Sequence, residues 1–215
     1  MKGLFITFEG VEGCGKSTQV ERLRAWLEAQ GHTVLVTREP GGVPIAEAIR
    51  SVLLHPDHHT MTPVTEILLY EAARAQLVHE RIRPALEAGQ TVLCDRFADS
   101  TTAYQGVGRN LPPEEVVRLH ALATQGIWPE LTFVLDLPVE EGLRRARNRG
   151  RFDRMEQQTI AFHERVREGF LAIAQNDPDR VKIIDAAPPP DVVFESVRAW
   201  VQPMLQNRRA ARSRL

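Results

Sequence analysis

A glycine-rich run near the amino terminus, GVEGCGKS at residues 10–17, constrains the fold more than any other stretch of the chain. It matches the pattern G-x-x-x-x-G-K-[ST], in which backbone N–H groups surround phosphate oxygens. An apolar run at residues 4–8 precedes it, and residues 18–29 follow with apolar side chains at helical spacing. Strand, glycine loop and helix in this order are the context that a phosphate-binding loop (P-loop) requires.

Each part of the P-loop has a chemical task. Gly10, Gly13 and Gly15 allow tight turns that bring N–H groups toward phosphate oxygens. Lys16 can reach the β- and γ-phosphates of a nucleoside triphosphate, and the Ser17 hydroxyl can hold Mg²⁺. The helix that begins near Lys16 adds the positive end of its dipole. We therefore predict a triphosphate site formed by Gly10, Val11, Glu12, Gly13, Cys14, Gly15, Lys16, Ser17 and Thr18.

The rest of the chain alternates between short apolar runs and helical patterns, with no repeat. Strands are predicted at residues 4–8, 32–37, 90–95, 131–136 and 181–185. Helices are predicted at residues 18–29, 44–54, 66–88, 113–124, 139–147, 157–175 and 190–205, the third bent near Pro84. This alternation predicts an α/β fold of the P-loop NTPase type, a three-layer sandwich with a five-stranded parallel sheet and helices on both faces.

The length of the chain indicates its domain organisation, and its net charge and cysteines indicate which partners and which compartment to expect. A chain of 215 residues suits one domain, placed at residues 1–206 and followed by a basic tail at 207–215 that is expected to be frayed. A net charge of −1 argues against a nucleic-acid partner, and no apolar run approaches the ~20 residues of a membrane span. Cys14 and Cys94 lack metal spacing, which favours a reducing cytoplasm. Three histidines at residues 55–59 are more typical of a solvated loop than of a metal site.

Charged side chains follow the predicted strands, at the edge of a parallel sheet where ligands bind. Asp95 ends the third strand and is the preferred metal-organising carboxylate, with Asp136 as its rival. Arg38 and Arg96 follow two strands and could grip a second phosphate group through paired guanidinium forks. Six arginines crowd residues 144–154, which predicts a basic lid at about 144–156; a solvated helix end that complements its own dipole is the alternative.

At this point the chain resembles the thymidylate kinase family, in the nucleoside monophosphate kinase superfamily. The matching stretches span nearly the whole predicted domain in family order: FEGVEGCGKST (8–18), TREPGG (37–42), LLYEAARAQ (68–76), DRFADSTTAYQG (95–106) and RARNRGRFDRME (145–156). The P-loop alone is shared by many proteins, whereas the combination of TREPGG, DR[FY] and STxAYQG is much more specific. The resemblance implies ATP and Mg²⁺ as cofactors, a homodimer, and a cis peptide between Glu39 and Pro40.

The resemblance also implies roles for individual residues. Tyr70 would stack on thymine, Arg74 would hydrogen-bond a thymine carbonyl, and Tyr104 would pack against the deoxyribose. The P-loop carries Glu12 and no arginine, which is similar to the bacterial type that supplies a catalytic arginine from the lid. The implied dTMP site consists of Glu12, Arg38, Pro40, Tyr70, Arg74, Arg96, Thr101, Tyr104 and Gln105. The implied catalytic set is Lys16, Asp95, Arg96 and lid residue Arg149, with Arg145 stacked on the donor adenine.

Three other functions remain as alternatives at this stage. A kinase for another small acceptor, such as dUMP or a deoxynucleoside, would keep the P-loop, although a deoxynucleoside needs no pair of arginines for its phosphate. A GTPase-like switch should carry N-K-x-D for guanine, and the sequence has no such motif. A binding-only module is the weakest alternative, because the lysine, serine, aspartate and arginines together form a phosphoryl-transfer set.

Overall fold

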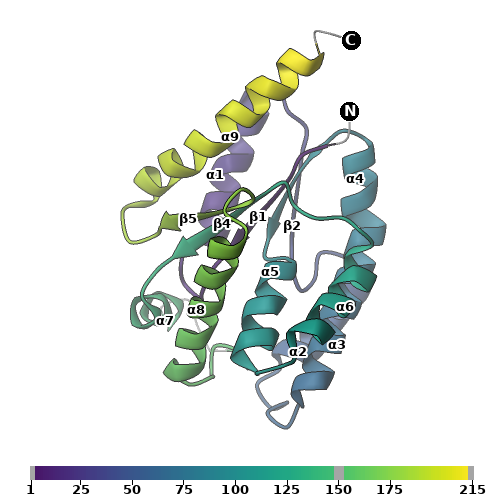
Figure 1. Ribbon diagram of the computed structural model, residues 1–215, viewed down its shortest axis with the longest axis vertical. Coiled ribbons are helices and arrows are strands. Elements are labelled where there is room, and N and C mark those ends of the chain that lie inside the picture. Colours follow the sequence, from purple (N-terminus) through teal and green to yellow (C-terminus); the bar gives the residue numbers. More distant parts are fainter. Residues whose placement is uncertain (1–2, 148–152, 213–215) are drawn as a thin grey trace.

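The fold is built around one parallel sheet, seen in a computed structural model that describes residues 3–147 and 153–212. The strand order is β2-β3-β1-β4-β5, and every neighbouring pair is parallel (Figure 1). The strands are β1 (Phe5–Glu9), β2 (Val34–Arg38), β3 (Thr91–Asp95), β4 (Leu131–Asp136) and β5 (Val181–Asp185). All five predicted strands are confirmed, and the last two match their predicted bounds.

Helices cover both faces of this sheet, which confirms the three-layer prediction. Alternating residues of β1 point to opposite faces: Ile6 and Phe8 pack in the core beneath α1 and α9, whereas Phe5 packs in the core beneath α3 and α4. Figure 1 shows α1 beside α9 and α3 beside α6. The helices are α1 (Lys16–Ala29), α2 (Pro44–Leu54), α3 (Pro63–Leu77), α4 (Arg83–Glu87), α5 (Ala98–Thr101), α6 (Pro113–Thr124), α7 (Val139–Arg147), α8 (Ile160–Asn176) and α9 (Pro190–Arg212).

The long helix predicted at residues 66–88 is one continuous helical segment with a changed pitch. It starts earlier than predicted, because Thr62 caps it by accepting a hydrogen bond from Thr65 N at 3.2 Å and Pro63 suits the first turn. A π-helical turn, η1 (Val78–Ile82), separates α3 from α4. This π-helical turn lies just before Pro84, where the sequence predicted a bend, and Pro84 lacks the N–H that regular helical hydrogen bonding needs.

Two other segments differ from the sequence-based expectation. Residues 100–108, where no helix was predicted, form the end of α5 and a second π-helical segment, η2 (Thr102–Gly108). The tail expected to be frayed from residue 207 is instead helical as far as Arg212. Alanine and arginine in this stretch are strong helix formers and no glycine or proline follows Pro203, so α9 has no local reason to stop at residue 206.

Two further findings concern membrane-spanning helices and the two cysteines. None of the helices in the described residues combines the length and apolar character needed to cross a bilayer. Cys14 and Cys94 are both buried with free thiols.

Candidate active site

The P-loop connects β1 to α1 and has the conformation that its glycines predict. Gly10, Gly13 and Gly15 have φ values of +129°, +71° and +97°, in the region that favours glycine. The Lys16 ammonium lies across the loop and donates to the carbonyls of Gly10 at 3.1 Å and Val11 at 2.9 Å. The Lys16 side chain therefore closes the loop from the start of α1, in a type of loop whose backbone N–H groups bind phosphate oxygens.

Helix α7 presses directly on this loop. A Cβ atom built on Gly13 would lie 2.0 Å from the carbonyl oxygen of Gly142, and one built on Gly142 would lie 2.3 Å from the carbonyl oxygen of Glu12. The two glycines therefore permit backbone-to-backbone contact between the P-loop and the helix that leads into the predicted lid. Sequence reasoning missed Gly142, which stands in α7 without any turn signal around it.

Ser17 and Asp95, the two residues proposed from the sequence as Mg²⁺ ligands, are in direct contact. The Ser17 hydroxyl donates to Asp95 Oδ2 at 2.6 Å, next to the phosphate-binding backbone. Asp136, the rival carboxylate, is instead engaged by both nitrogens of an Arg167 fork at 2.7 and 2.9 Å. Among the described residues no cluster of three or more histidine, cysteine or acidic side chains could hold a metal. One hydroxyl and one carboxylate beside a phosphate cradle nevertheless suit Mg²⁺, which takes few protein ligands and completes its shell with phosphate oxygens and water.

Arg96 ties the end of β3 to the P-loop. Its backbone adopts φ = +72°, an uncommon conformation for a residue with a side chain. Its guanidinium donates to Gly10 O at 3.0 Å and to the Tyr104 hydroxyl at 3.0 Å, and it lies over the Tyr104 ring, 4.9 Å from the centroid. Tyr104 in turn donates to Glu12 Oε1 at 2.6 Å. Three residues of the implied dTMP site, one of them in the P-loop, thus form a single connected cluster.

Glu12 is held in that cluster by a histidine that sequence reasoning did not find. Nδ1 of His163, on α8, lies 3.1 Å from Glu12 Oε2. Burial acts to raise the pKa of Glu12, but contact with His163 and the nearby charge of Arg96 outweigh it and hold the pKa well below its usual range. Glu12 is therefore an anion among the cationic groups of the P-loop end. A single histidine in a long amphipathic helix gave no sequence signal for this contact.

Arg38, the last residue of β2, and Pro40, two residues later, also line the cavity. Arg38 is half exposed and donates to both carboxylate oxygens of Glu47, at 2.9 and 3.1 Å. The peptide between Glu39 and Pro40 is cis, as the resemblance implied. Arg50 donates to the Pro40 carbonyl at 2.7 Å, which fixes this turn from α2. Arg38 and Arg96 follow neighbouring strands, so both guanidinium groups border one opening.

Arg74 lies at the far end of this opening and is buried, with 1% of its side chain exposed. Its guanidinium contacts Glu39 at 2.7 Å, Glu71 at 2.5 Å and the Thr101 hydroxyl at 3.0 Å. Arg74 is therefore a buried residue of the cavity wall and not a surface arginine. Tyr70, one turn before Arg74, also borders the opening, and burial raises the pKa of its hydroxyl.

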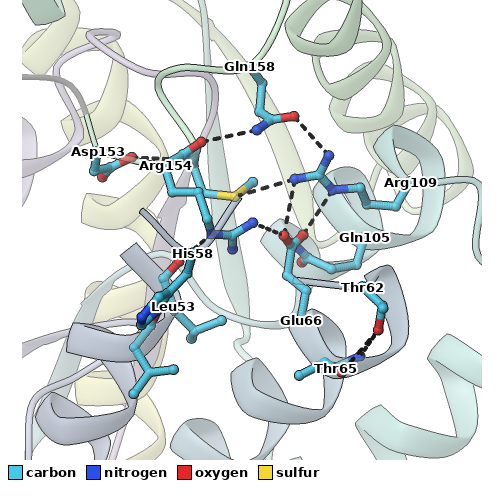
Figure 2. Close-up of polar contacts among 12 residues, drawn as sticks. Leu53, His58, Thr62, Thr65, Glu66, Gln105, Arg109, Asp153, Arg154 and Gln158 are labelled. Carbon is cyan, nitrogen blue, oxygen red and sulfur yellow. Dashed lines mark hydrogen bonds and ion pairs between the residues drawn. The ribbon is translucent and has the colours of Figure 1, made fainter. Parts of the chain in front are cut away.

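Glu66 organises a second buried cluster beside this end of the opening (Figure 2). Its carboxylate accepts from Gln105 Nε2 at 2.9 Å, from Arg109 at 3.1 Å and from Arg154 at 2.6 Å. Arg154 also donates to the Leu53 carbonyl at 2.7 Å. Arg154 belongs to the predicted lid at 144–156, and it is 4% exposed and anchors the end of that segment to α2 and α3.

One cavity of about 250 Å³ joins these groups and brings most of the predicted site together. The predicted residues that line it are Glu12, Gly13, Gly15, Lys16, Ser17, Arg38, Pro40, Tyr70, Arg74, Asp95, Arg96, Thr101, Tyr104 and Gln105. The predicted residues outside its lining are Gly10, Val11, Cys14, Thr18 and Arg145; the last donates to Glu141 at 2.7 Å and to the Ala186 carbonyl at 3.3 Å. Arg149 lies outside the described residues.

Several residues of the site were missed, chiefly acidic ones. Glu66, Tyr70 and Arg74 follow one another at four-residue intervals, so they share one face of α3, and this spacing could have found Glu66. Glu71 precedes Arg74 by three residues, a similar signal. Glu39 follows Arg38 in the TREPGG stretch but contacts Arg74, 35 residues away, which no local pattern predicts.

A P-loop at the carboxyl edge of a parallel sheet, facing a polar cavity bordered by two strand-end arginines, defines the class of P-loop nucleotide kinases. The comparisons with known proteins give the family. The thymidylate kinase family model matches residues 8–197. The chain therefore belongs to the thymidylate kinase family.

Individual relatives agree with this assignment. Over 191 residues the chain is 54% identical to the thymidylate kinase of Geotalea uraniireducens, covering 86% of this chain and 90% of the relative. It is 53% identical over 200 residues to that of Deinococcus radiodurans, covering 93% and 97% of the two chains. The crystal structure of thymidylate kinase from Ehrlichia chaffeensis superposes with a TM-score of 0.76 at 31% identity, covering 94% of this chain and 99% of that one.

Proposed function

We propose that this chain transfers the γ-phosphoryl group of ATP to dTMP, giving dTDP. The observation that carries the proposal is the single cavity that runs from Lys16 and Ser17 of the P-loop, past Arg96, to Tyr70 and Arg74. A donor triphosphate at the P-loop and an acceptor nucleotide with its base at the far end would place two phosphates in one space. Phosphoryl transfer is mainly a matter of such positioning and of balancing the negative charge of the transition state.

The residues divide into three groups along this cavity. Lys16 and the P-loop N–H groups bind the donor phosphates, and Arg38 and Arg96 grip the acceptor phosphate. Ser17 and Asp95 would hold Mg²⁺, which when bound neutralises charge on the β- and γ-phosphates. Catalysis then depends on these groups being fixed before the phosphoryl group moves.

The lid completes the proposed mechanism. We assign residues 1–206 to one kinase domain in which residues 144–156 form the lid, followed by a basic tail at 207–215. Arg149 would stabilise the transition-state charge, because the P-loop carries Glu12 in place of an arginine. Arg145 would stack on adenine, and its place on α7, the helix against the P-loop, supports a position near the donor nucleotide.

We also propose a homodimer that works in the cytoplasm. Leu68 on α3 and Leu122 on α6 are 50% and 76% exposed, and these two helices pack side by side. Their apolar exposed side chains would be covered by a second copy. Leu77, also on α3, is fully buried within its own chain and does not take part. Two free thiols suit a reducing compartment, and light scattering at micromolar concentration tests the dimer.

The enzymatic proposal is tested by ADP release over a panel of nucleoside monophosphates with ATP and Mg²⁺. We expect release that depends on dTMP, with dTDP as the nucleotide product. Hydrolysis of ATP that no monophosphate stimulates would overturn the proposal. Omission of Mg²⁺ is the matched control, and it should abolish the release.

A further inference from the structure

The carboxylate of Glu66 is buried and fully occupied as an acceptor. Only 1% of its side chain is exposed. It accepts from Gln105 Nε2 and from Arg109 Nε at Oε1, and from the Arg109 and Arg154 guanidinium groups at Oε2, over 2.6–3.1 Å. Burial acts to raise the pKa of Glu66, but the hydrogen bonds from Arg109 and Gln105 outweigh it and lower the pKa. Glu66 is therefore an ionised group that accepts hydrogen bonds and donates none.

This partner decides which way the Gln105 amide points. An amide has a donating nitrogen and an accepting oxygen at opposite ends, and only the nitrogen can face a carboxylate. Because Nε2 donates to Glu66, Oε1 is left without a bond to that carboxylate. Within the parts of the chain that the structure describes, no donor is bonded to Oε1. Gln105 lines the cavity, at the end that also holds Tyr70 and Arg74.

A fixed acceptor at this end of the cavity distinguishes two pyrimidines. Thymine carries a donor at N3 and an acceptor at O4, whereas cytosine carries an acceptor at N3 and a donor at the neighbouring amino group. Gln105 Oε1 can pair with the thymine N3–H and would meet cytosine N3 acceptor to acceptor. Arg74 offers only donors, which suit O4 and oppose the cytosine amino group. The two side chains together present the complement of thymine.

We propose that Glu66 is a positioning residue that holds the Gln105 amide with its oxygen toward the base and thereby favours dTMP over dCMP. The inference rests on the proposed function for the position of the base. Glu66 itself touches no substrate in this arrangement, since it acts through Gln105. The consequence is that specificity depends on a carboxylate that lies behind the cavity wall.

Glu66→Gln is the direct test, because the new amide offers a donor as well as an acceptor at almost unchanged size. Two guanidinium donors face the Oε2 position and one faces Oε1, so the oxygen of the new side chain should take the Oε2 position. Its nitrogen then faces Gln105, and the Gln105 amide turns to present Nε2 to the base. We expect the ratio of kcat/KM for dCMP to kcat/KM for dTMP to rise about 10-fold or more. This change corresponds to the net free energy of one or two hydrogen bonds.

Two further variants distinguish an effect on the orientation of the Gln105 amide from a general disturbance of packing around Glu66. Arg109→Lys disturbs the same cluster but leaves Glu66 ionised beside Arg154, so the dCMP to dTMP ratio should stay at its unmodified value. The double variant Glu66→Gln with Gln105→Glu exchanges carboxylate and amide. It presents an acceptor to the base in either orientation and should restore the preference for dTMP.

The outcomes distinguish this inference from the proposed function. Failure of the unmodified protein to phosphorylate dTMP would overturn the function and the inference with it. With that activity present, a folded Glu66→Gln protein with an unchanged ratio overturns the inference alone, as does a double variant that is as permissive as the single one. If Glu66→Gln does not fold, the double variant decides: preference for dTMP supports the inference, and loss of that preference overturns it.

Discussion

The two ends of the cavity are constructed in different ways. The phosphate end is made by one contiguous run, residues 10–17, whose backbone provides most of the binding groups. The base end is made by side chains from α3, η2 and the end of β2, held in place by the buried carboxylates Glu39, Glu66 and Glu71. The phosphate end therefore depends on local conformation, whereas the base end depends on buried ion pairs between distant segments. Substitutions at the phosphate end should therefore lower turnover, whereas substitutions at the base end should lower both stability and specificity.

The largest effect on activity is expected at the phosphate end. Lys16→Ala removes the only ammonium group that borders the described cavity, without opening the core. Turnover should fall by on the order of 10³-fold or more for every acceptor alike, since the loss concerns phosphate charge. The melting temperature should change little. Near-normal turnover in the presence of Mg²⁺ would show that the P-loop is not the site of phosphoryl transfer.

At the base end a similar truncation should cost stability as well as specificity. Arg74→Ala leaves Glu39 and Glu71 buried without their cation. Breaking a buried ion pair from one side costs about 3–5 kcal/mol, so the free energy of unfolding should fall by that order. Chemical denaturation measures it. Arg24→Ala, which removes an exposed arginine bonded to two glutamates, is the matched control and should leave the unfolding midpoint nearly unchanged.

A substitution in the lid should lower turnover, as at the phosphate end, and should not change the selection of the base. Arg149→Ala is expected to lower kcat by on the order of 10²-fold, as for other preorganised charge-stabilising donors. The ratio of kcat/KM between dTMP and dUMP should not change, because the lost charge acts on the transferring group. A change in that ratio with kcat preserved would place Arg149 in base recognition and contradict the assignment.

The smallest effect on activity is expected from a buried carboxyl group beneath the phosphate end, where the predicted change concerns stability. Glu9 accepts from Phe97 N at 2.7 Å and from the Ser100 hydroxyl at 2.5 Å, and burial raises its pKa to about 8. Between pH 4.5 and 8 the folded state keeps a proton that the unfolded chain releases, so stability falls as pH rises through this window.

Glu9→Gln cannot titrate and should lack this component. Its melting temperature should fall less between pH 5 and pH 8 than that of the unmodified protein, by about 2–4 °C for each kcal/mol of linkage. Contributions from all other titrating groups cancel in the comparison. Parallel pH profiles of the two proteins would show that Glu9 has no raised pKa.

The same contrast between the two ends explains how much could be predicted from the sequence. The five strands and the P-loop geometry follow from local patterns, and the contact of Ser17 with Asp95 follows from the edge of a parallel sheet. The base end followed from family resemblance, and its supporting glutamates were missed. Glu39 and Arg74 meet only through packing of segments far apart in the chain, for which the sequence carries no periodic signal.

The central claim, that the base end is built for thymine, is tested most directly by kcat/KM of the unmodified protein for dTMP, dUMP and dCMP. We expect dTMP to be the best substrate. dUMP lacks only a methyl group, a difference of ~1–3 kcal/mol, and should be used weakly. dCMP would face mismatched hydrogen bonds and should be poorer by on the order of 10⁴-fold. Equal use of dTMP and dCMP would contradict the thymidylate assignment while leaving the phosphate end as described.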